Sequence, residues 1–295
     1  MALDTERIQK NVRKLEKSLK RALKHSAPEE VHDLRTRIRR VQATVEALSL
    51  DSHRNERRLM NRLSRIHKKA GKVRDLDVLT SDLSALHIKE ETNCLIQLFE
   101  YLGAQRYKHA ARLVRTIRNN KNVIKMRLRK TSARLEKLLG KNDQPTVQTE
   151  AVAKTMASAM ELSSELATVS NLNRANLHEF RLKVKELRYV LQMSNKATHV
   201  RFIEALGKVK DAIGEWHDWE ELIAISQDLL HHGSSCKLLH EFRVISSRKY
   251  EFALSLANKL RKEYLRPSDR NAKGPGGDKN KLDQTALKAV STIAT

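Results

Sequence analysis

A histidine-and-base pattern that occurs twice constrains the fold of this chain most strongly. The first copy begins at His32 and reads HDLRTRIRR, and the second begins at His178 and reads HEFRLKVKELRY. Both follow H-x-x-R-x-x-x-[RK] within helix-period segments, one in each half of the chain. A pattern that repeats together with its flanks indicates a duplicated structural unit. The alignment of the two copies that places His32 on His178 is called the histidine register below.

A second matching block extends the repeat. The segment AGKVRDLDVL, which begins at Ala70, matches IGEWHDWEEL, which begins at Ile213. The alignment that places Gly71 on Gly214 is called the glycine register. The two matching blocks occur in the same order and at nearly equal offsets, so they favour two similar units along one chain.

The composition favours helices over strands. Only nine Gly and four Pro occur in 295 residues, which leaves little turn chemistry for a β protein. Aromatic residues make up 4% of the chain, so aliphatic side chains must fill the core. We therefore expect an all-α fold with helices over residues 4–25, 28–49, 51–70, 73–86, 90–139 (as one helix or as two broken near Asn119-Asn120), 146–168, 173–194, 198–213, 214–231 and 236–265.

Several residues are expected to start or end these helices. Pro28 suits a first helical turn, and Asp51-Ser52 suits an N-cap. Gly71 and Gly214 are expected to break helices, which would place Asp75 and Asp218 near the starts of the next ones. Helix capping and an ion pair that orients a base are the favoured roles of these two residues, and catalysis is the alternative.

The domain boundaries follow from loop-type composition. The segment 140–145 is the clearest internal linker, and residues 267–281 are polar, Gly-rich and expected to be disordered. We therefore expect one folded region over residues 1–266, with a first repeat at about 4–140, a second at about 146–265, and a tail over 267–295.

The two histidine-patterned helices place their histidines away from the core. On a helical wheel, the apolar residues fall opposite the histidine in both copies. They are Leu34, Ile38, Val41, Val45 and Leu48 in the first copy, and Phe180, Val184, Leu187 and Leu191 in the second. Each copy therefore has a cationic face directed outward from its own core.

The charge of the chain points to polyanions. The formal net charge is +23, of which +18 falls in residues 1–140. Such a field attracts nucleic acid, anionic lipid or inorganic polyphosphate, and charge alone does not choose among them. Arg offers a planar donor fork for phosphate, Lys a mobile charge, and protonation of His is favoured near phosphate.

The candidate anion ligands come from four of the expected helices. Any one base outside the two histidine-patterned helices is more simply interpreted as part of a solvated helix face. The full candidate set is His32, Arg35, Arg39 and Arg40, then Arg58, Arg62, Arg65 and Lys69, then His178, Arg181, Lys185, Arg188 and Tyr189, then Lys208.

These blocks resemble the conserved histidine α-helical domain, or CHAD, over about residues 4–265. The resemblance implies two four-helix bundles related by a pseudo-twofold axis, with a basic central pore that binds inorganic polyphosphate and an association with polyphosphate granules. It carries a binding role to His32, Arg35, Arg39 and Arg40, and to His178, Arg181, Lys185, Arg188 and Tyr189. The chain departs from the family pattern at Gln42, Glu186 and His217.

A non-catalytic, stand-alone polyphosphate-binding module in the cytoplasm is the resulting hypothesis. No cofactor is expected, since neither a phosphate-cradling Gly loop nor a Ser-His-Asp arrangement can be argued. Some members of the family also have a triphosphate-hydrolase domain. Such a domain would need many more residues and a glutamate-rich strand pattern, and we expect neither in this chain. No apolar run is long enough to span a membrane. The oligomeric state stays open.

Two other functions compete with this hypothesis. A helical nucleic-acid-binding protein fits the charge equally well, but the chain has few aromatics for base stacking. A metal site at His32 and His178 is disfavoured because both are surrounded by cations, and His231-His232 lie at an expected helix end. Cys94 and Cys236 have no ligand-type spacing and are expected to be unpaired thiols.

Overall fold

The protein is helical throughout the part that the structure describes. The computed structural model describes residues 5–48, 50–86, 92–139, 145–193, 200–230 and 236–265, which form helices and connecting turns without a strand. The expected all-α class is therefore confirmed. Most of the expected linker at 140–145, the dipeptide His231-His232 and the tail at 267–295 lie outside these ranges.

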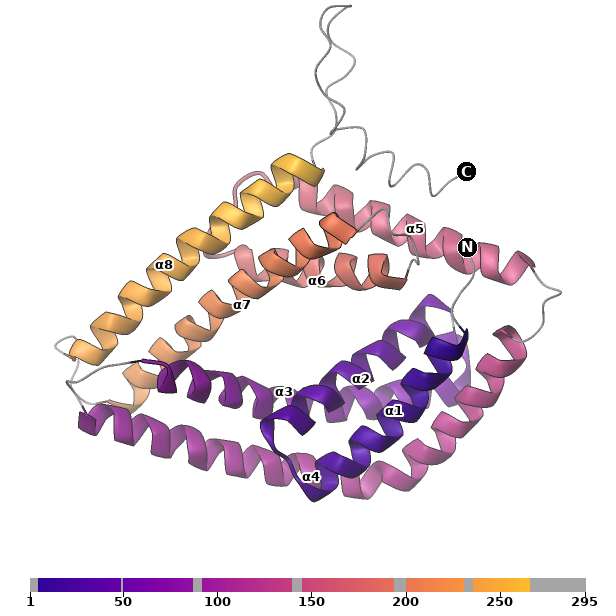
Figure 1. Ribbon diagram of the computed structural model, residues 1–295, viewed down its shortest axis with the longest axis horizontal. Coiled ribbons are helices and arrows are strands. Elements are labelled where there is room, and N and C mark those ends of the chain that lie inside the picture. Colours follow the sequence, from indigo (N-terminus) through magenta and orange to yellow (C-terminus); the bar gives the residue numbers. More distant parts are fainter. Residues whose placement is uncertain are drawn as a thin grey trace, which may run out of the picture. The chain divides into compact units, whose positions relative to one another are not determined.

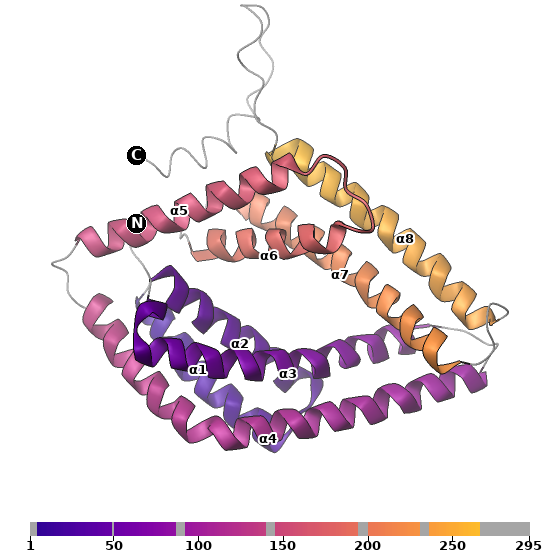
Figure 2. The same cartoon turned by 180° about the vertical axis from the view of Figure 1, so that it is seen from behind.

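Eight α-helices follow one another along the described chain (Figures 1 and 2). In the first half they are α1 (Thr5–Lys24), α2 (Pro28–Ala47), α3 (Arg54–Ser84) and α4 (Thr92–Leu139). In the second half they are α5 (Pro145–Thr168), α6 (Leu177–Met193), α7 (Val200–Leu229) and α8 (Lys237–Leu260). A 3-10 turn at Leu50–Ser52 precedes α3, and a π turn at Arg261–Leu265 follows α8.

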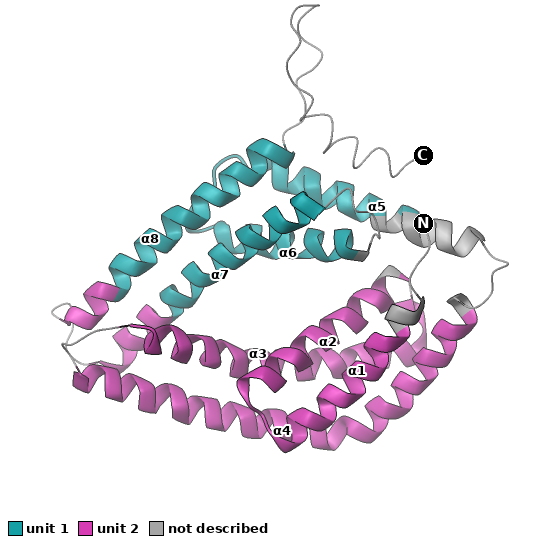
Figure 3. Cartoon of the chain, viewed as in Figure 1, with its two compact units in different colours: residues 1, 152–221, 242–295 teal, residues 2–151, 222–241 magenta. Residues whose placement is uncertain are grey.

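The chain divides into two compact units (Figure 3). Unit 2 comprises Ala2–Ala151 and Leu222–Glu241, and the larger segments of unit 1 are Val152–Glu221 and Phe242–Thr295. Within unit 2, α1 packs on α2, α2 on α3, α3 on α4 and α4 on α1, and all four helices share one apolar core. Within unit 1, residues of α5, α6, α7 and α8 share a second core.

Both outward-facing cationic helices bury the expected apolar stripe. Leu34 and Ile38 on α2 are fully buried, as are Val184 and Leu187 on α6. The histidine that begins each pattern is exposed. The helical wheel therefore predicted the core faces of α2 and α6 correctly, because a 3.6-residue period leaves one face for the core.

Neither Gly71 nor Gly214 breaks a helix, contrary to expectation. α3 runs without interruption from Arg54 to Ser84, and α7 from Val200 to Leu229. Asp75 and Asp218 consequently lie inside helices and do not cap them. Glycine within a helix lowers helix stability by about 1 kcal/mol relative to alanine. A contact with another helix is therefore expected to explain each glycine.

The structure settles the open alternative over residues 90–139 as one helix and corrects one more local prediction. Asn119-Asn120 does not divide α4, because the Asn120 amide donates to the Thr116 carbonyl at 2.8 Å and its side-chain oxygen accepts from Arg62. Asp51-Ser52 lies in the 3-10 turn, and the residue at the N-cap of α3 is His53, which makes no side-chain capping hydrogen bond.

The start of α6 lies later than expected, at Leu177. Asn173 and Asn176 organise the preceding turn through their side chains. The Asn176 Oδ1 accepts from the Asn173 backbone N at 2.8 Å, and the Asn173 Oδ1 accepts from the Ala175 backbone N at 2.9 Å. Such side-chain-to-backbone bonds compete with helix formation and delay its first turn.

Two remaining expectations concern thiols and membranes. Cys94 and Cys236 are both buried and are not joined in a disulfide, as expected. Among the described helices, none combines the length and the apolar character that crossing a membrane requires.

Candidate anion-binding site

The arginine that follows each motif histidine packs against a glycine of the next long helix in the same unit. In unit 2, a Cβ added to Gly71 would overlap the Arg35 Nη1 atom. In unit 1, a Cβ added to Gly214 would lie 2.8 Å from the Arg181 Nη2 atom. The repeated Arg–Gly contact explains both glycines, since only a residue without a Cβ leaves room for the guanidinium.

Further contacts fix the cationic face of α6 on α7. The Arg181 Nε donates to the Lys210 carbonyl at 3.1 Å. The Arg188 Nε would lie 3.4 Å from a Cβ added to Gly207. Arg181 is therefore held by a backbone hydrogen bond before any ligand binds, and Arg188 packs beside the backbone of Gly207.

The position in unit 2 that corresponds to the Arg188–Gly207 contact has a different pair of residues. The histidine register aligns Arg188 with Gln42, and the glycine register aligns Gly207 with Ser64. The Gln42 Nε2 donates to the Ser64 Oγ at 2.9 Å. The departure at Gln42 is therefore half of a paired exchange, in which a shorter amide faces a hydroxyl instead of an arginine facing a glycine.

The predicted bases of α3 lie on a different flank of that helix. Gly71 and Ser64 face α2, whereas Arg62 donates to Asn120 of α4. The pKa of Arg127 on α4 is lowered by its burial and then by the charges of Arg58 and Arg62. Arg58 and Arg62 are therefore grouped with α4 and not with Arg35.

Lys69 lies on the same flank of α3 as Arg58 and Arg62. The pKa of His109 on α4 is lowered by burial and, among its neighbouring cations, by Lys72 and Lys69. The predicted first-half cations therefore divide between the Arg35 side and the α4 side of α3.

The remaining predicted residues have these positions. Arg40 lies toward α1, where it contributes to lowering the pKa of Lys14 after Arg37, the largest influence. Arg65 and Lys208 are exposed, and Arg39, Lys185 and Tyr189 are half-buried on the cationic faces of α2 and α6.

The exposed His178 is paired with a second histidine within unit 1. Its ring centroid lies 4.8 Å from that of His217 on α7, with the rings tilted by 38°. The pKa of His178 is lowered by burial, then by His217, Arg181 and Lys185. The lowered pKa favours the neutral imidazole of His178 in the free protein, and a nearby phosphate would favour its protonation.

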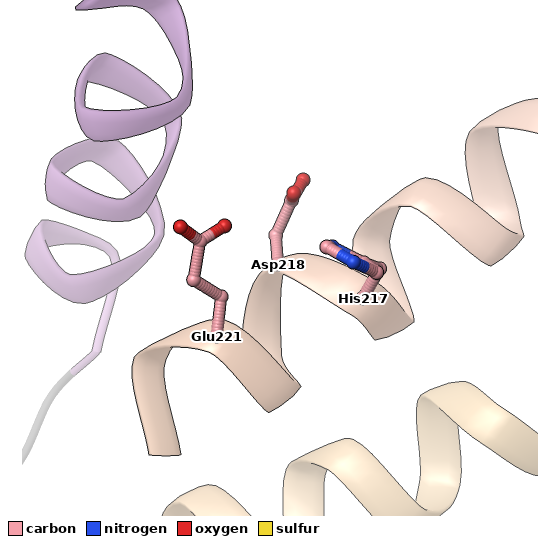
Figure 4. A group of neighbouring side chains, drawn as sticks. All are labelled: His217, Asp218 and Glu221. Carbon is pink, nitrogen blue, oxygen red and sulfur yellow. The ribbon is translucent and has the colours of Figure 1, made fainter. Parts of the chain in front are cut away.

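A second group of polar side chains lies on the same stretch of α7. Figure 4 shows the side chains of His217, Asp218 and Glu221, with Asp218 between the other two. One ligand atom from each lies within 4.8 Å of the others. Among the described residues, these three form the group of His, Cys, Asp or Glu side chains whose ligand atoms lie this close together.

Sequence reasoning missed the contacts of the glycines and the proximity of His217, Asp218 and Glu221. Gly71 and Gly214 accommodate arginines where helix breaks are expected, and nothing local in the sequence distinguishes Gly207 or Ser64. The two repeat registers are the available signal, because they align Arg35 with Arg181 and Gly71 with Gly214.

Comparisons with known proteins agree with the helical architecture. The family model described as the CHAD domain matches residues 6–227. The crystal structure of the CHAD domain from the plant Ricinus communis superposes with a TM-score of 0.62 at 13% sequence identity, covering 88% of this chain and 91% of that one. At that identity the likeness concerns the fold alone. No curated protein matches this sequence.

Proposed function

The chain belongs to the CHAD family, and on that premise we propose that it binds inorganic polyphosphate without catalysing its turnover. The observation that carries the proposal is the repeated Arg–Gly contact, Arg35 on Gly71 and Arg181 on Gly214. A guanidinium that is already held in place loses less conformational entropy when it binds an anion. The same device in both units suits a ligand whose phosphates are chemically alike.

The charge of the chain supports a polyanionic ligand. The +23 formal charge attracts long anionic chains. Charge-assisted hydrogen bonds from Arg, Lys and protonated His would provide the affinity. The basic pore and the association with polyphosphate granules are further parts of this proposal.

Competition between two polyanions tests the proposal. The full chain is loaded with labelled single-stranded RNA and challenged with long-chain polyphosphate, and the reverse experiment is run in parallel. We expect polyphosphate to displace RNA at a much lower phosphate concentration, because the described helices offer few exposed aromatic rings for base stacking. Preferential displacement of polyphosphate by RNA would support the nucleic-acid-binding alternative instead.

Glycine substitutions provide a more specific prediction. Gly71→Ala and Gly214→Ala should each weaken polyphosphate binding by about tenfold, which corresponds to the loss of one well-placed charge-assisted hydrogen bond. The added methyl group displaces the guanidinium of Arg35 or Arg181. The measurements are a binding titration and a thermal unfolding curve of each variant.

Stability distinguishes this effect from simple unfolding. Alanine is a better helix former than glycine by about 0.5–1 kcal/mol, and the displaced atoms belong to flexible ends of arginine side chains. We therefore expect unfolding temperatures that are unchanged or raised. Gly103→Ala on α4 is the matched control, because nothing lies within 4 Å of its added Cβ, and its binding should equal that of the parent. Unchanged binding in the Gly71 and Gly214 variants would contradict the positioning role.

A further inference from the structure

The second copy of the repeat contains metal-type ligands that the first copy lacks. In the glycine register, His217, Asp218 and Glu221 align with residues 74, 75 and 78, which are Arg, Asp and Val. The first copy therefore has a formal charge of zero at these positions and a single metal-type donor. The second copy has an imidazole, two carboxylates and, with His counted as neutral, a formal charge of −2.

The helix brings these three donors to one place. Residues i and i+4 share a helix face, so His217 and Glu221 lie one turn apart with Asp218 beside them. Figure 4 shows this arrangement on α7, and one ligand atom of each residue lies within 4.8 Å of the others. Ligands of one ion at about 2.1 Å are separated by at most about 4.2 Å. Rotation about the side-chain bonds of Asp218 and Glu221 would close the difference.

The surroundings contain charges of both signs. On α6, Arg181 and Lys185 lie near His178, whose ring contacts that of His217, and their charges oppose a bound cation. Arg181 is directed to the Lys210 carbonyl and Gly214. Two carboxylates in direct contact with an ion act at a shorter distance than these cations, and Coulomb energy decreases with distance.

We propose that His217, Asp218 and Glu221 form a binding site for a divalent transition-metal ion such as Zn²⁺. One imidazole nitrogen with two carboxylate oxygens suits Zn²⁺ or Mn²⁺ better than Ca²⁺, which prefers oxygen ligands alone. Three protein ligands leave at least one coordination position for water or for an anion oxygen. The site is distinct from the motif histidine–arginine pattern and does not depend on the proposed polyphosphate binding.

Calorimetric titration with Zn²⁺ tests the site. The full chain is freed of metal with a chelator, dialysed and titrated without polyphosphate. The parent should bind with an affinity that falls at least tenfold in His217→Ala and in the double variant Asp218→Asn/Glu221→Gln. Co²⁺ should show visible absorption bands that the same variants lose.

Two further variants keep the outcome interpretable. His217→Arg installs the residue that the first copy has at the aligned position, so it should fold and still lose the Zn²⁺ site. Asp75→Asn is the matched control in the first copy and should bind Zn²⁺ like the parent. Zn²⁺ affinity that stays unchanged in His217→Arg, or no Zn²⁺ binding by the parent chain, would overturn the proposal.

Discussion

Replacing Arg35, Arg39, Arg181 and Lys185 together with alanine should abolish polyphosphate retention while the helices stay intact. Each charge-assisted hydrogen bond contributes about 1.5–3 kcal/mol, so the loss of four should weaken binding by at least about a thousandfold. The four side chains are half-buried on α2 and α6 and lie outside the apolar stripes that form the cores. Retention on immobilised polyphosphate measures the first effect, and far-ultraviolet circular dichroism the second.

A charge-matched control separates specific contacts from the general field. Lys17, Lys130, Arg243 and Arg248 are exposed on α1, α4 and α8, and replacing them with alanine removes the same four charges. This control should bind only a few times more weakly than the parent. If the quadruple variant binds no worse than the control, the polyanion site lies elsewhere, and the α3–α4 flank with Arg58, Arg62 and Arg127 becomes the next candidate.

The second large effect concerns stability. Arg106→Ala should lower the free energy of unfolding by about 3 kcal/mol, because it leaves a buried carboxylate without its ion-pair partner. The side chain of Asp77 is 2% exposed, and the Arg106 Nε donates to it at 2.5 Å. The Arg106 Nη2 also donates to the Ser26 carbonyl at 2.7 Å, so one side chain joins α3, α4 and the turn before α2. Urea unfolding measures the change.

The second copy provides the control for this prediction. Glu220 aligns with Asp77 in the glycine register and pairs with Arg174 at 3.3 Å. Both of these side chains are substantially exposed, at 39% and 51%, so Arg174→Ala should cost less than about 1 kcal/mol. Equal losses in the two variants would show that burial of the carboxylate does not determine the penalty.

The sequence predicted the fold well where the information is periodic and local. The buried stripe of α2 and the start of that helix at Pro28, with Glu29 and Glu30 in its first turn, follow from neighbouring residues along one helix. Apolar period and first-turn chemistry are properties of short segments. These features therefore need no knowledge of the rest of the chain.

The errors occurred where another helix determines the role of a residue. A break is expected at Gly71 because glycine is a poor helix former, yet its neighbour Arg35 belongs to the preceding helix, α2. The alternative left open near Asn120 likewise depends on another helix, because its partner Arg62 belongs to α3. Such tertiary contacts override local propensity, and only the repeat registers indicate them in advance.

The candidate site was predicted in part for the same reason. Arg35 and Arg181 are identified by their recurrence, and the structure shows that each is held against a glycine. Arg58 and Arg62 are included in the predicted site on charge alone, although they lie beside α4. Charge identifies which residues attract an anion, but the flank of the helix decides which of them act together.

The Arg188–Gly207 and Gln42–Ser64 contacts have a consequence for which glycines the packing can replace. The Arg188 Nε lies 3.4 Å from the position of a Cβ on Gly207, which is an ordinary van der Waals distance, so this contact leaves room for a methyl group. An added Cβ would overlap the Arg35 Nη1 at Gly71 and would lie 2.8 Å from the Arg181 Nη2 at Gly214. A residue larger than glycine, such as Ser64 at the aligned position of unit 2, is therefore tolerated beside the first contact and excluded by the other two unless an arginine moves.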